Sequence, residues 1–186
     1  MQYDDSLSES YRRFLAGDES AAREVMDGLF LGLVRFIAGY VRDMPSAEDI
    51  AMDVMAELFA KRRGYEPRSK LKTYAYMRGK CLALDLLRHR KALPFEGLDA
   101  CGDLPDGRAE LDAELLKTER ERELSKALDL LPADLRAAVR LVYFEGMSYE
   151  EAARVLKKTR KQTDNLLYRA KLKLREILGE EGRDLL

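Results

Sequence analysis

The strongest constraint on the fold is a run of local helix signals in residues 148–178, SYEEAARVLKKTRKQTDNLLYRAKLKLREIL. Ser148 and Glu151 have the spacing of a capping box, which predicts a short helix that ends near Leu156. Thr159 follows as a second N-cap candidate and begins a longer helix. Two helices joined by a turn of about three residues form a helix-turn-helix.

The rest of the chain also favours helix. Of all residues 36% are charged, and Leu, Ala, Glu, Lys and Arg, which favour helix, dominate the composition. No strand pattern of convincing length is present, so the sequence predicts an all-α fold. Asp18 and Ser46 are the expected N-caps of the second and third helices. The expected helices cover roughly residues 6–16, 18–42, 46–63, 69–90, 109–131, 132–144, 148–156 and 159–178.

An acidic segment divides the chain into two parts. Prolines and glycines break the helical pattern there, at Pro94, Gly97, Gly102, Pro105 and Gly107. We therefore expect two small helical domains, residues 1–91 and 113–186, joined by a flexible acidic linker at residues 92–112.

Positive charge gathers on both sides of this segment although the whole chain has a net charge of −1. Residues 61–91 hold eleven basic and two acidic side chains, and residues 154–175 hold nine basic and one acidic side chain. Solvated helix faces explain one such patch more easily than two. The charge pattern therefore points to nucleic acid.

The last expected helix has the geometry of a DNA reader. Lys161, Asn165 and Arg169 are spaced by four residues and line up along one ridge, opposite a face of Leu166, Leu167, Ala170 and Leu174. Amide and cationic groups are the chemistry that recognises base edges in the major groove. Gln162 and Tyr168 share the exposed face, whereas Arg160, Lys157, Lys158, Lys171 and Lys173 suit phosphates.

Other functional classes find little support. The chain has one histidine and two cysteines, and it has no phosphate-binding glycine loop or nucleophile motif. We therefore expect no enzyme, metal, cofactor or small-molecule substrate. The longest apolar stretch, residues 29–41, is too short for a bilayer and contains Arg35, so we expect no membrane insertion. The acidic start MQYDDSL is unlike a secretory signal, which favours the cytoplasm.

Three quoted segments carry a family resemblance. ALDLLPADLRAAVRLVYFEGMSYEEAARVLKKTRKQTDNLLYRAKLKLREIL resembles the C-terminal promoter-binding domain of extracytoplasmic-function sigma factors of bacterial RNA polymerase. SAEDIAMDVMAELF resembles the polymerase-binding helix of that family, and LKTYAYMRGKCLALDLLRHRK resembles its minus-10 promoter helix. The resemblance covers most of the chain and keeps the family's order.

The resemblance implies a role for each segment. Core RNA polymerase and promoter DNA would be the partners, with a controlling anti-sigma factor. The minus-35 element would be read by Arg160, Lys161, Gln162, Asn165, Tyr168 and Arg169. The minus-10 element would be bound and opened by Lys70, Lys72, Tyr74, Tyr76, Arg78, Lys80 and Arg88, where both tyrosines could stack on bases and Tyr76 could equally be a core residue. The polymerase would be bound by Asp49, Asp53 and Glu57.

Two other functions are compatible with parts of the sequence. A stand-alone helix-turn-helix regulator would use the same C-terminal domain without polymerase, but it leaves SAEDIAMDVMAELF unexplained. A helical adaptor would have no nucleic-acid role. For a sigma factor, a linker of this length spans roughly 25–30 Å on average. It therefore cannot fix the distance between two DNA readers, and docking on polymerase would have to set it.

Overall fold

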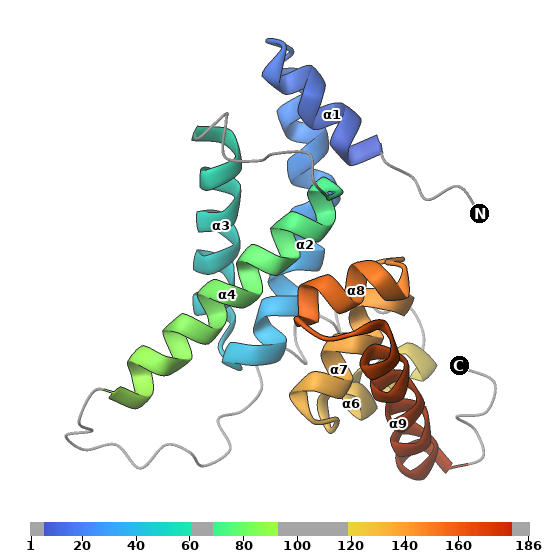
Figure 1. The fold of residues 1–186 in the computed structure, drawn as a ribbon. Helices are drawn as coiled ribbons and strands as arrows, with labels where there is room; N and C mark the ends of the chain where they lie inside the picture. The colour runs from blue at the N-terminus through green and yellow to red at the C-terminus, as the bar shows by residue number, and fades with distance from the viewer. Residues whose placement is uncertain (1–5, 61–68, 93–118, 180–186) are drawn as a thin grey trace.

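The protein consists of two helical units. The computed structural model describes residues 6–60, 69–92 and 119–179, and none of these residues lies in a strand, so the all-α prediction is confirmed. The N-terminal unit contains α1 (Ser6–Leu15), α2 (Ser20–Val41), α3 (Met44–Ala60) and α4 (Leu71–Ala92) (Figure 1). The C-terminal unit contains α6 (Glu119–Asp129), α7 (Ala133–Val139), the π-helical segment η1 (Arg140–Phe144), α8 (Tyr149–Leu156) and α9 (Arg160–Leu178).

Helix α2 is the centre of the N-terminal unit. Its residues Val25, Leu29, Leu33 and Ile37 recur every four positions and are fully buried. This apolar stripe faces the other three helices of the unit, all of which pack on α2. The stripe therefore explains why a sequence so rich in charge still forms a core.

Helices α2 and α4 approach closely at Gly79. A Cβ atom at this position would lie 3.0 Å from Leu33 Cδ1 and 3.1 Å from Ile37 Cδ1. These distances are tighter than most real Cβ contacts, so a side chain at this position would push Leu33 and Ile37 back by a few tenths of an ångström, and glycine allows α4 to pack more closely on the core.

Residues far away in the sequence hold the ends of α3 and α4. The Leu71 amide at the start of α4 donates to Ser8 Oγ at 3.0 Å, and Ser8 is buried. The Tyr11 hydroxyl donates to the Leu58 carbonyl near the end of α3 at 2.7 Å. Because helix ends leave backbone groups without helical partners, α1 contributes the partners that these two ends need.

One of the two N-cap predictions needs correction. The Asp18 carboxylate caps the start of α2 as predicted, because it accepts from the Ser20 amide at 3.1 Å and Glu19 between them already has a helical backbone. Helix α3 begins at Met44, ahead of the expected cap Ser46. The reason is that the Asp43 carboxylate accepts from the Ser46 amide, which makes an earlier start possible.

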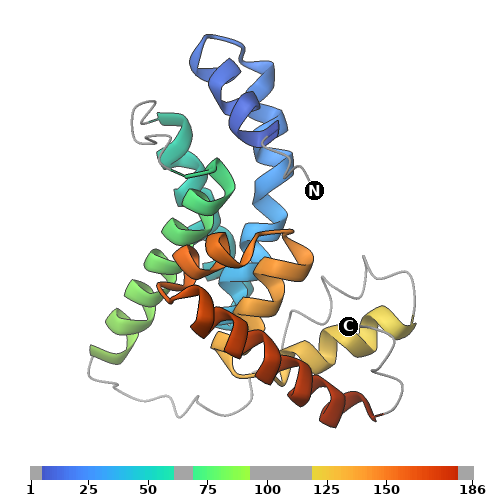
Figure 2. The same ribbon diagram turned by 45° about the vertical axis from the view of Figure 1, so that its right-hand side comes forward.

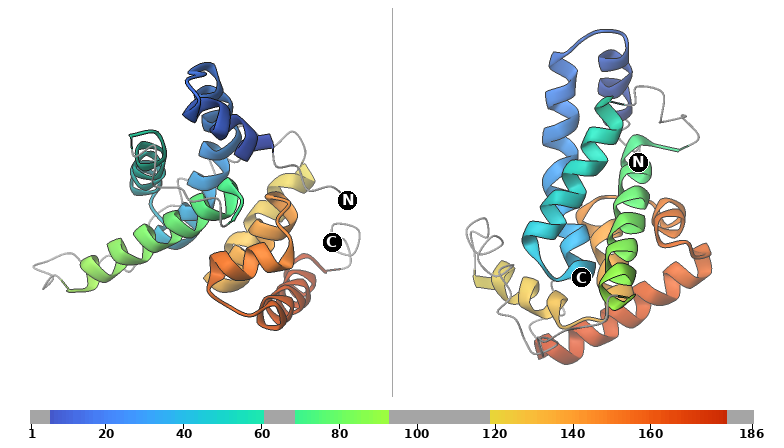
Figure 3. Two further views of the ribbon diagram at one scale, coloured as in Figure 1. Left: turned by 45° about the horizontal axis from the view of Figure 1, so that its top comes forward. Right: turned by 90° about the vertical axis from the view of Figure 1, so that its left-hand side faces the viewer.

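The two units pack against each other, which the sequence analysis did not predict. Helix α8 contacts α4, and α7 contacts α2 (Figures 2 and 3). The structure describes no residue from 93 to 118. The expected linker after Ala92 and the predicted start of the second domain at residue 113 therefore lie outside the described residues. Within the described part of the chain, no helix is long and apolar enough to cross a bilayer.

We expect Ser8→Ala to lower the free energy of unfolding by about 1–3 kcal/mol, because the Leu71 amide would stay buried without an acceptor. Urea unfolding followed by circular dichroism measures this change. Amide hydrogen exchange should speed up first at the start of α4. An unchanged midpoint, with unchanged exchange at Leu71, would show that water replaces the hydroxyl.

Candidate nucleic-acid interface

The helix-turn-helix is built from two capped helices. The Ser148 hydroxyl accepts from the Glu151 amide at 3.2 Å, while the Glu151 carboxylate accepts from the Ser148 amide at 2.8 Å. The predicted capping box of α8 is therefore confirmed. Lys157 has a φ of +56° and ends α8 in the left-handed conformation, which turns the chain toward α9.

Thr159 begins α9 as predicted, with a second capping box that the sequence analysis had not recognised. Its hydroxyl accepts from the Gln162 amide at 3.2 Å, and Gln162 Oε1 accepts from the Thr159 amide at 2.8 Å. The side-chain oxygen of Gln162, which is a predicted base reader, is thus already engaged by the Thr159 amide. The side-chain amide nitrogen is left to contact DNA.

One face of α9 is exposed over its first three turns. Lys161, Asn165 and Arg169 are exposed and, within the described residues, have no side-chain partner. Tyr168 beside them is 65% exposed. The opposite face is buried against the C-terminal unit through Leu166, Leu167, Ala170 and Leu174. An exposed cationic and amide ridge on a well-anchored helix can enter a major groove.

Arg160 lies at the edge of this face. Its guanidinium pairs with the Glu150 carboxylate of α8 at 3.1 Å, and both side chains are largely exposed. Exposed pairs of this kind contribute little, so a phosphate can compete for Arg160.

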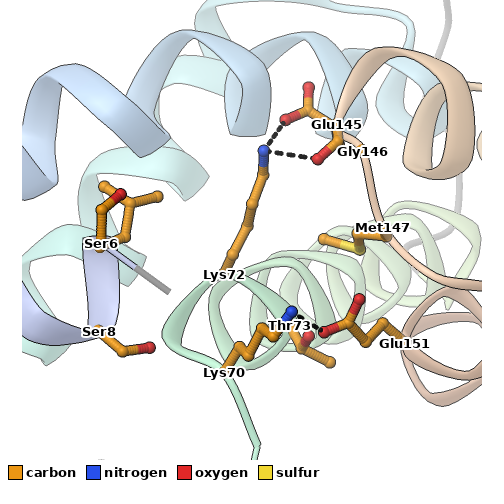
Figure 4. Close-up of a pocket in the computed structure, with 10 residues that line it drawn as sticks. Ser6, Ser8, Lys70, Lys72, Thr73, Glu145, Gly146, Met147 and Glu151 are labelled. Atoms are coloured by element: carbon orange, nitrogen blue, oxygen red, sulfur yellow. Dashed lines mark hydrogen bonds and ion pairs between the residues drawn. The ribbon is translucent and has the colours of Figure 1, made fainter. Parts of the chain in front are cut away.

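Helix α4 presents a second cationic surface, but it faces the C-terminal unit. Lys72, Tyr76 and Lys80 are spaced by four residues and form what we call the α4 ridge. The Lys72 ammonium lies 2.8 Å from the Glu145 carboxylate and donates to the Glu145 carbonyl at 2.8 Å (Figure 4). Lys70, just before the helix, pairs with Glu151 at 3.0 Å.

Lys80 is more deeply buried than the other lysines of this surface. It is only 7% exposed and donates to the carbonyl of Leu156, the last residue of α8, at 2.8 Å. Burial lowers the pKa of its ammonium group. The carbonyl end of a helix carries partial negative charge, which stabilises the cation.

Tyr76 is fully buried in this conformation. Its ring packs on Phe36 with the centroids 5.1 Å apart. Burial, and then the Glu145 carboxylate, raises the pKa of its hydroxyl well above the usual value. The ring therefore has no surface for base stacking in this conformation.

The remaining α4 candidates lie away from this ridge. Arg78 makes a two-pronged ion pair with Glu57 of α3, at 2.6 and 2.7 Å, which raises the Arg78 pKa. Arg88 pairs with Asp85 at 2.7 Å and is largely exposed. Tyr74 is half-buried.

Helix α3 carries an exposed acidic face. Asp49 and Asp53 are exposed on it, whereas Glu57 is engaged by Arg78. A cavity of about 290 Å³ lies beside these acids, lined by Asp53, Ala56, Glu57, Ala60 and Leu82. Met52 is 51% exposed on the same helix, so this face offers both apolar and acidic contacts.

Residues of the C-terminal unit that contact the N-terminal unit were not among the predicted site residues. Glu145 and Glu151 meet Lys72 and Lys70, and the buried Arg136 donates to the Gly39 carbonyl at 2.6 Å. The two residues of the last bond are 97 positions apart. No local pattern marks such partners.

Two family models match the chain. Sigma-70 region 2 matches residues 28–92, and Sigma-70, region 4 matches residues 121–174. The first range contains α4 and most of α2, and the second contains the helix-turn-helix. Each match thus lies within one of the two units.

Curated relatives agree with these models. The chain is 26% identical to the ECF RNA polymerase sigma factor SigX of Bacillus subtilis (strain 168) over 159 residues, 82% of each protein. It is 27% identical to SigE of Mycolicibacterium smegmatis, also an ECF RNA polymerase sigma factor, over 74% of this chain and 54% of that protein.

Solved structures share the fold. The sigma factor RpoE of Bartonella quintana, crystallised with the anti-sigma factor NepR, is 22% identical with a TM-score of 0.61, covering 85% of this chain and 96% of that chain. CnrH, solved in complex with the cytosolic domain of CnrY, is 19% identical with a TM-score of 0.63, covering 94% and 97%.

We expect Thr159→Ala to lower the free energy of unfolding by about 1 kcal/mol, because the Gln162 amide at the start of α9 loses its acceptor. Thr159→Ser is the matched control, since it keeps the hydroxyl and should change stability little. Chemical denaturation of the full chain measures both. Equal losses in the two variants would assign the effect to the threonine methyl group.

Proposed function

The chain belongs to the extracytoplasmic-function (ECF) sigma factors of bacterial RNA polymerase, and we propose a division of labour between its two units. As a sigma factor it directs RNA polymerase to promoters. The C-terminal unit would read the minus-35 element, and the N-terminal unit would bind core polymerase and help open the minus-10 element. The observation that supports this most is the pairing of a region 2 match with a region 4 match in one chain. A stand-alone regulator would need no region 2.

The minus-35 contact is proposed for the exposed face of α9. Lys161, Asn165 and Arg169 would reach base edges, because amide and cationic side chains there can pair bidentately with adenine and guanine. Gln162 and Tyr168 flank this ridge. Arg160 would bind a phosphate after leaving Glu150.

The minus-10 contact is proposed for α4 and the residues before it. Lys70, Lys72 and Lys80 would bind phosphates of the separated strand, together with Arg78 and Arg88. Tyr74 is half-buried and could add stacking after a small movement, whereas Tyr76 would need the C-terminal unit to leave. Opening would use binding energy alone, so the proposed role is not enzymatic.

Core polymerase is proposed to dock on α3. Asp49 and Asp53 are exposed there beside the exposed Met52 and a cavity of about 290 Å³. An apolar centre with charged neighbours is a common composition for a protein interface. Glu57 would contribute by orienting Arg78, with which it is paired.

Two further parts of the role follow from the family. Since core polymerase and its DNA are in the bacterial cytoplasm, we propose that compartment for the chain. The RpoE structure contains an anti-sigma factor and the CnrH structure contains the cytosolic domain of CnrY, which supports an anti-sigma partner for this chain too.

The promoter-reading ridge can be tested by run-off transcription with core polymerase on a promoter library. Arg169→Ala and Asn165→Ala should each change which promoters respond, with roughly 10- to 100-fold losses on individual promoters, since one base contact is worth about 1–3 kcal/mol. Arg175→Ala removes the same charge from the exposed end of α9 and should leave the promoter set unchanged. The same promoter set for all three variants would remove the ridge from the proposal.

The polymerase surface can be tested by charge reversal. Asp53→Lys should weaken association with core polymerase by at least about tenfold, because like charges or lost pairs at an interface cost several kcal/mol. Asp27→Lys on α2 is the control, since Asp27 is equally exposed. Fluorescence anisotropy of the labelled chain measures both affinities. Equal affinities would place the polymerase contact elsewhere.

A further inference from the structure

The packed arrangement of the two units covers the surface that we assign to the minus-10 element. Lys72, Tyr76 and Lys80 all face the C-terminal unit, and Lys80 and Tyr76 are 7% and 0% exposed. A phosphate cannot reach Lys80 without moving that unit, and the Tyr76 ring, which packs on Phe36 of α2, is closed to bases in this arrangement.

The groups that cover Lys70 and the lysines of the α4 ridge are oxygens of two carboxylates and of one backbone carbonyl at the end of a helix. Carboxylates of Glu145 and Glu151 pair with Lys72 and Lys70, and the Leu156 carbonyl at the end of α8 accepts from Lys80. These oxygens lie 2.8–3.0 Å from the ammonium groups, the distance at which a DNA phosphate would bind them. The C-terminal unit therefore fills the same positions that promoter phosphates would take.

The fit is specific around Glu145. A Cβ atom on Gly32 of α2 would lie 2.7 and 2.9 Å from the two carboxylate oxygens of Glu145, and it would also clash with the Tyr76 hydroxyl. The missing side chain at Gly32 thus leaves the room that the Glu145 carboxylate occupies. Arg136 adds a hydrogen bond in which the C-terminal unit is the donor, because its guanidinium donates to the Gly39 carbonyl of α2.

The interface between the two units is partly exposed and incompletely packed. The side chains of Lys70 and Lys72 remain 31% and 26% exposed, so a competing anion can approach their ammonium groups. Their partners Glu151 and Glu145 are only 12% and 11% exposed, so salt screens these pairs less than it screens fully exposed pairs. A cavity of about 250 Å³ lies between the pairs, lined by Ser6, Ser8, Lys70, Lys72, Glu145 and Met147 (Figure 4). Such loose packing contributes less than a close-packed core does.

The packing of the two units leaves the proposed DNA-binding face of α9 uncovered. Lys161, Asn165 and Arg169 on α9 stay exposed, because α8 rather than α9 makes the principal contact with α4 (Figure 3, left). The packed state therefore covers one of the two proposed DNA surfaces and leaves the other accessible.

We propose that the C-terminal unit is an intramolecular competitor of promoter DNA: in the free chain Glu145 and the end of α8 occupy the lysines of the α4 ridge, Glu151 occupies Lys70, and single-stranded minus-10 DNA must displace them. This inference rests on the proposed assignment of α4 to the minus-10 element. The competition makes the free sigma factor bind single-stranded DNA weakly, although the lysines that would bind its phosphates are already arranged along α4.

The double variant Glu145→Gln and Glu151→Gln tests the proposal with little change in shape. Glutamine at position 151 can keep the capping box of α8, so the fold is preserved while both charges are lost. The matched control is Glu123→Gln with Glu176→Gln, which removes two exposed carboxylates of the same unit away from the interface.

Binding of a short, fluorescently labelled single-stranded DNA of random sequence is the first measurement. The interface variant should bind about fivefold more tightly than the control, as expected for the loss of two partly exposed ion pairs. Equal affinities in the two variants would overturn the competition.

Carbodiimide coupling of the wild-type chain tests the closed state without reference to DNA function. This reagent joins amines to carboxylates that are in contact, so mass spectrometry should find Lys72–Glu145 and Lys70–Glu151 links, and excess single-stranded DNA should suppress them. Absence of both links would overturn the closed state in solution. Links that DNA does not suppress would overturn the competition. Run-off transcription by the wild-type chain with core polymerase tests the sigma role separately.

Discussion

The structure depends on the two opposite faces of α4. One face packs closely on α2, where Gly79 leaves room for Leu33 and Ile37. The other face carries lysines that pair with the C-terminal unit. The first contact is apolar and fixes the helix in its unit, whereas the second is ionic and sensitive to salt. Because α4 is rigidly held on one side, whatever binds its other face meets a preformed row of cations.

The difference between the two faces of α4 explains how a chain with almost no net charge can still present a cationic surface. With a net charge of −1, the protein has no long-range attraction for phosphates as a whole. Its cations are gathered on α9 and near the start of α4, and acids of the same chain pair with the second group. Local arrangement, rather than total charge, therefore sets where nucleic acid can bind.

The contact between the units also changes the expected role of the linker. A long tether by itself leaves two readers at an undefined distance. Ion pairs between the units give the free chain a defined arrangement, in which α9 is exposed and the α4 ridge is covered. Polymerase would then have to replace one arrangement with another, which couples its binding to the uncovering of the ridge.

The sequence by itself determined the features that depend on near neighbours. Three predicted features depend only on residues within about four positions of each other, so they can be predicted from the sequence. These are the capping box of Ser148 and Glu151, the start of α9 at Thr159 and the polar ridge of α9. The start of α3 was wrong by two residues because Asp43 competed with Ser46 for the role of cap. Only the tertiary structure decided which side of α4 would be covered and by what. Lys72 and Glu145 are 73 positions apart, and their pairing follows from how two finished units pack, for which no local pattern exists.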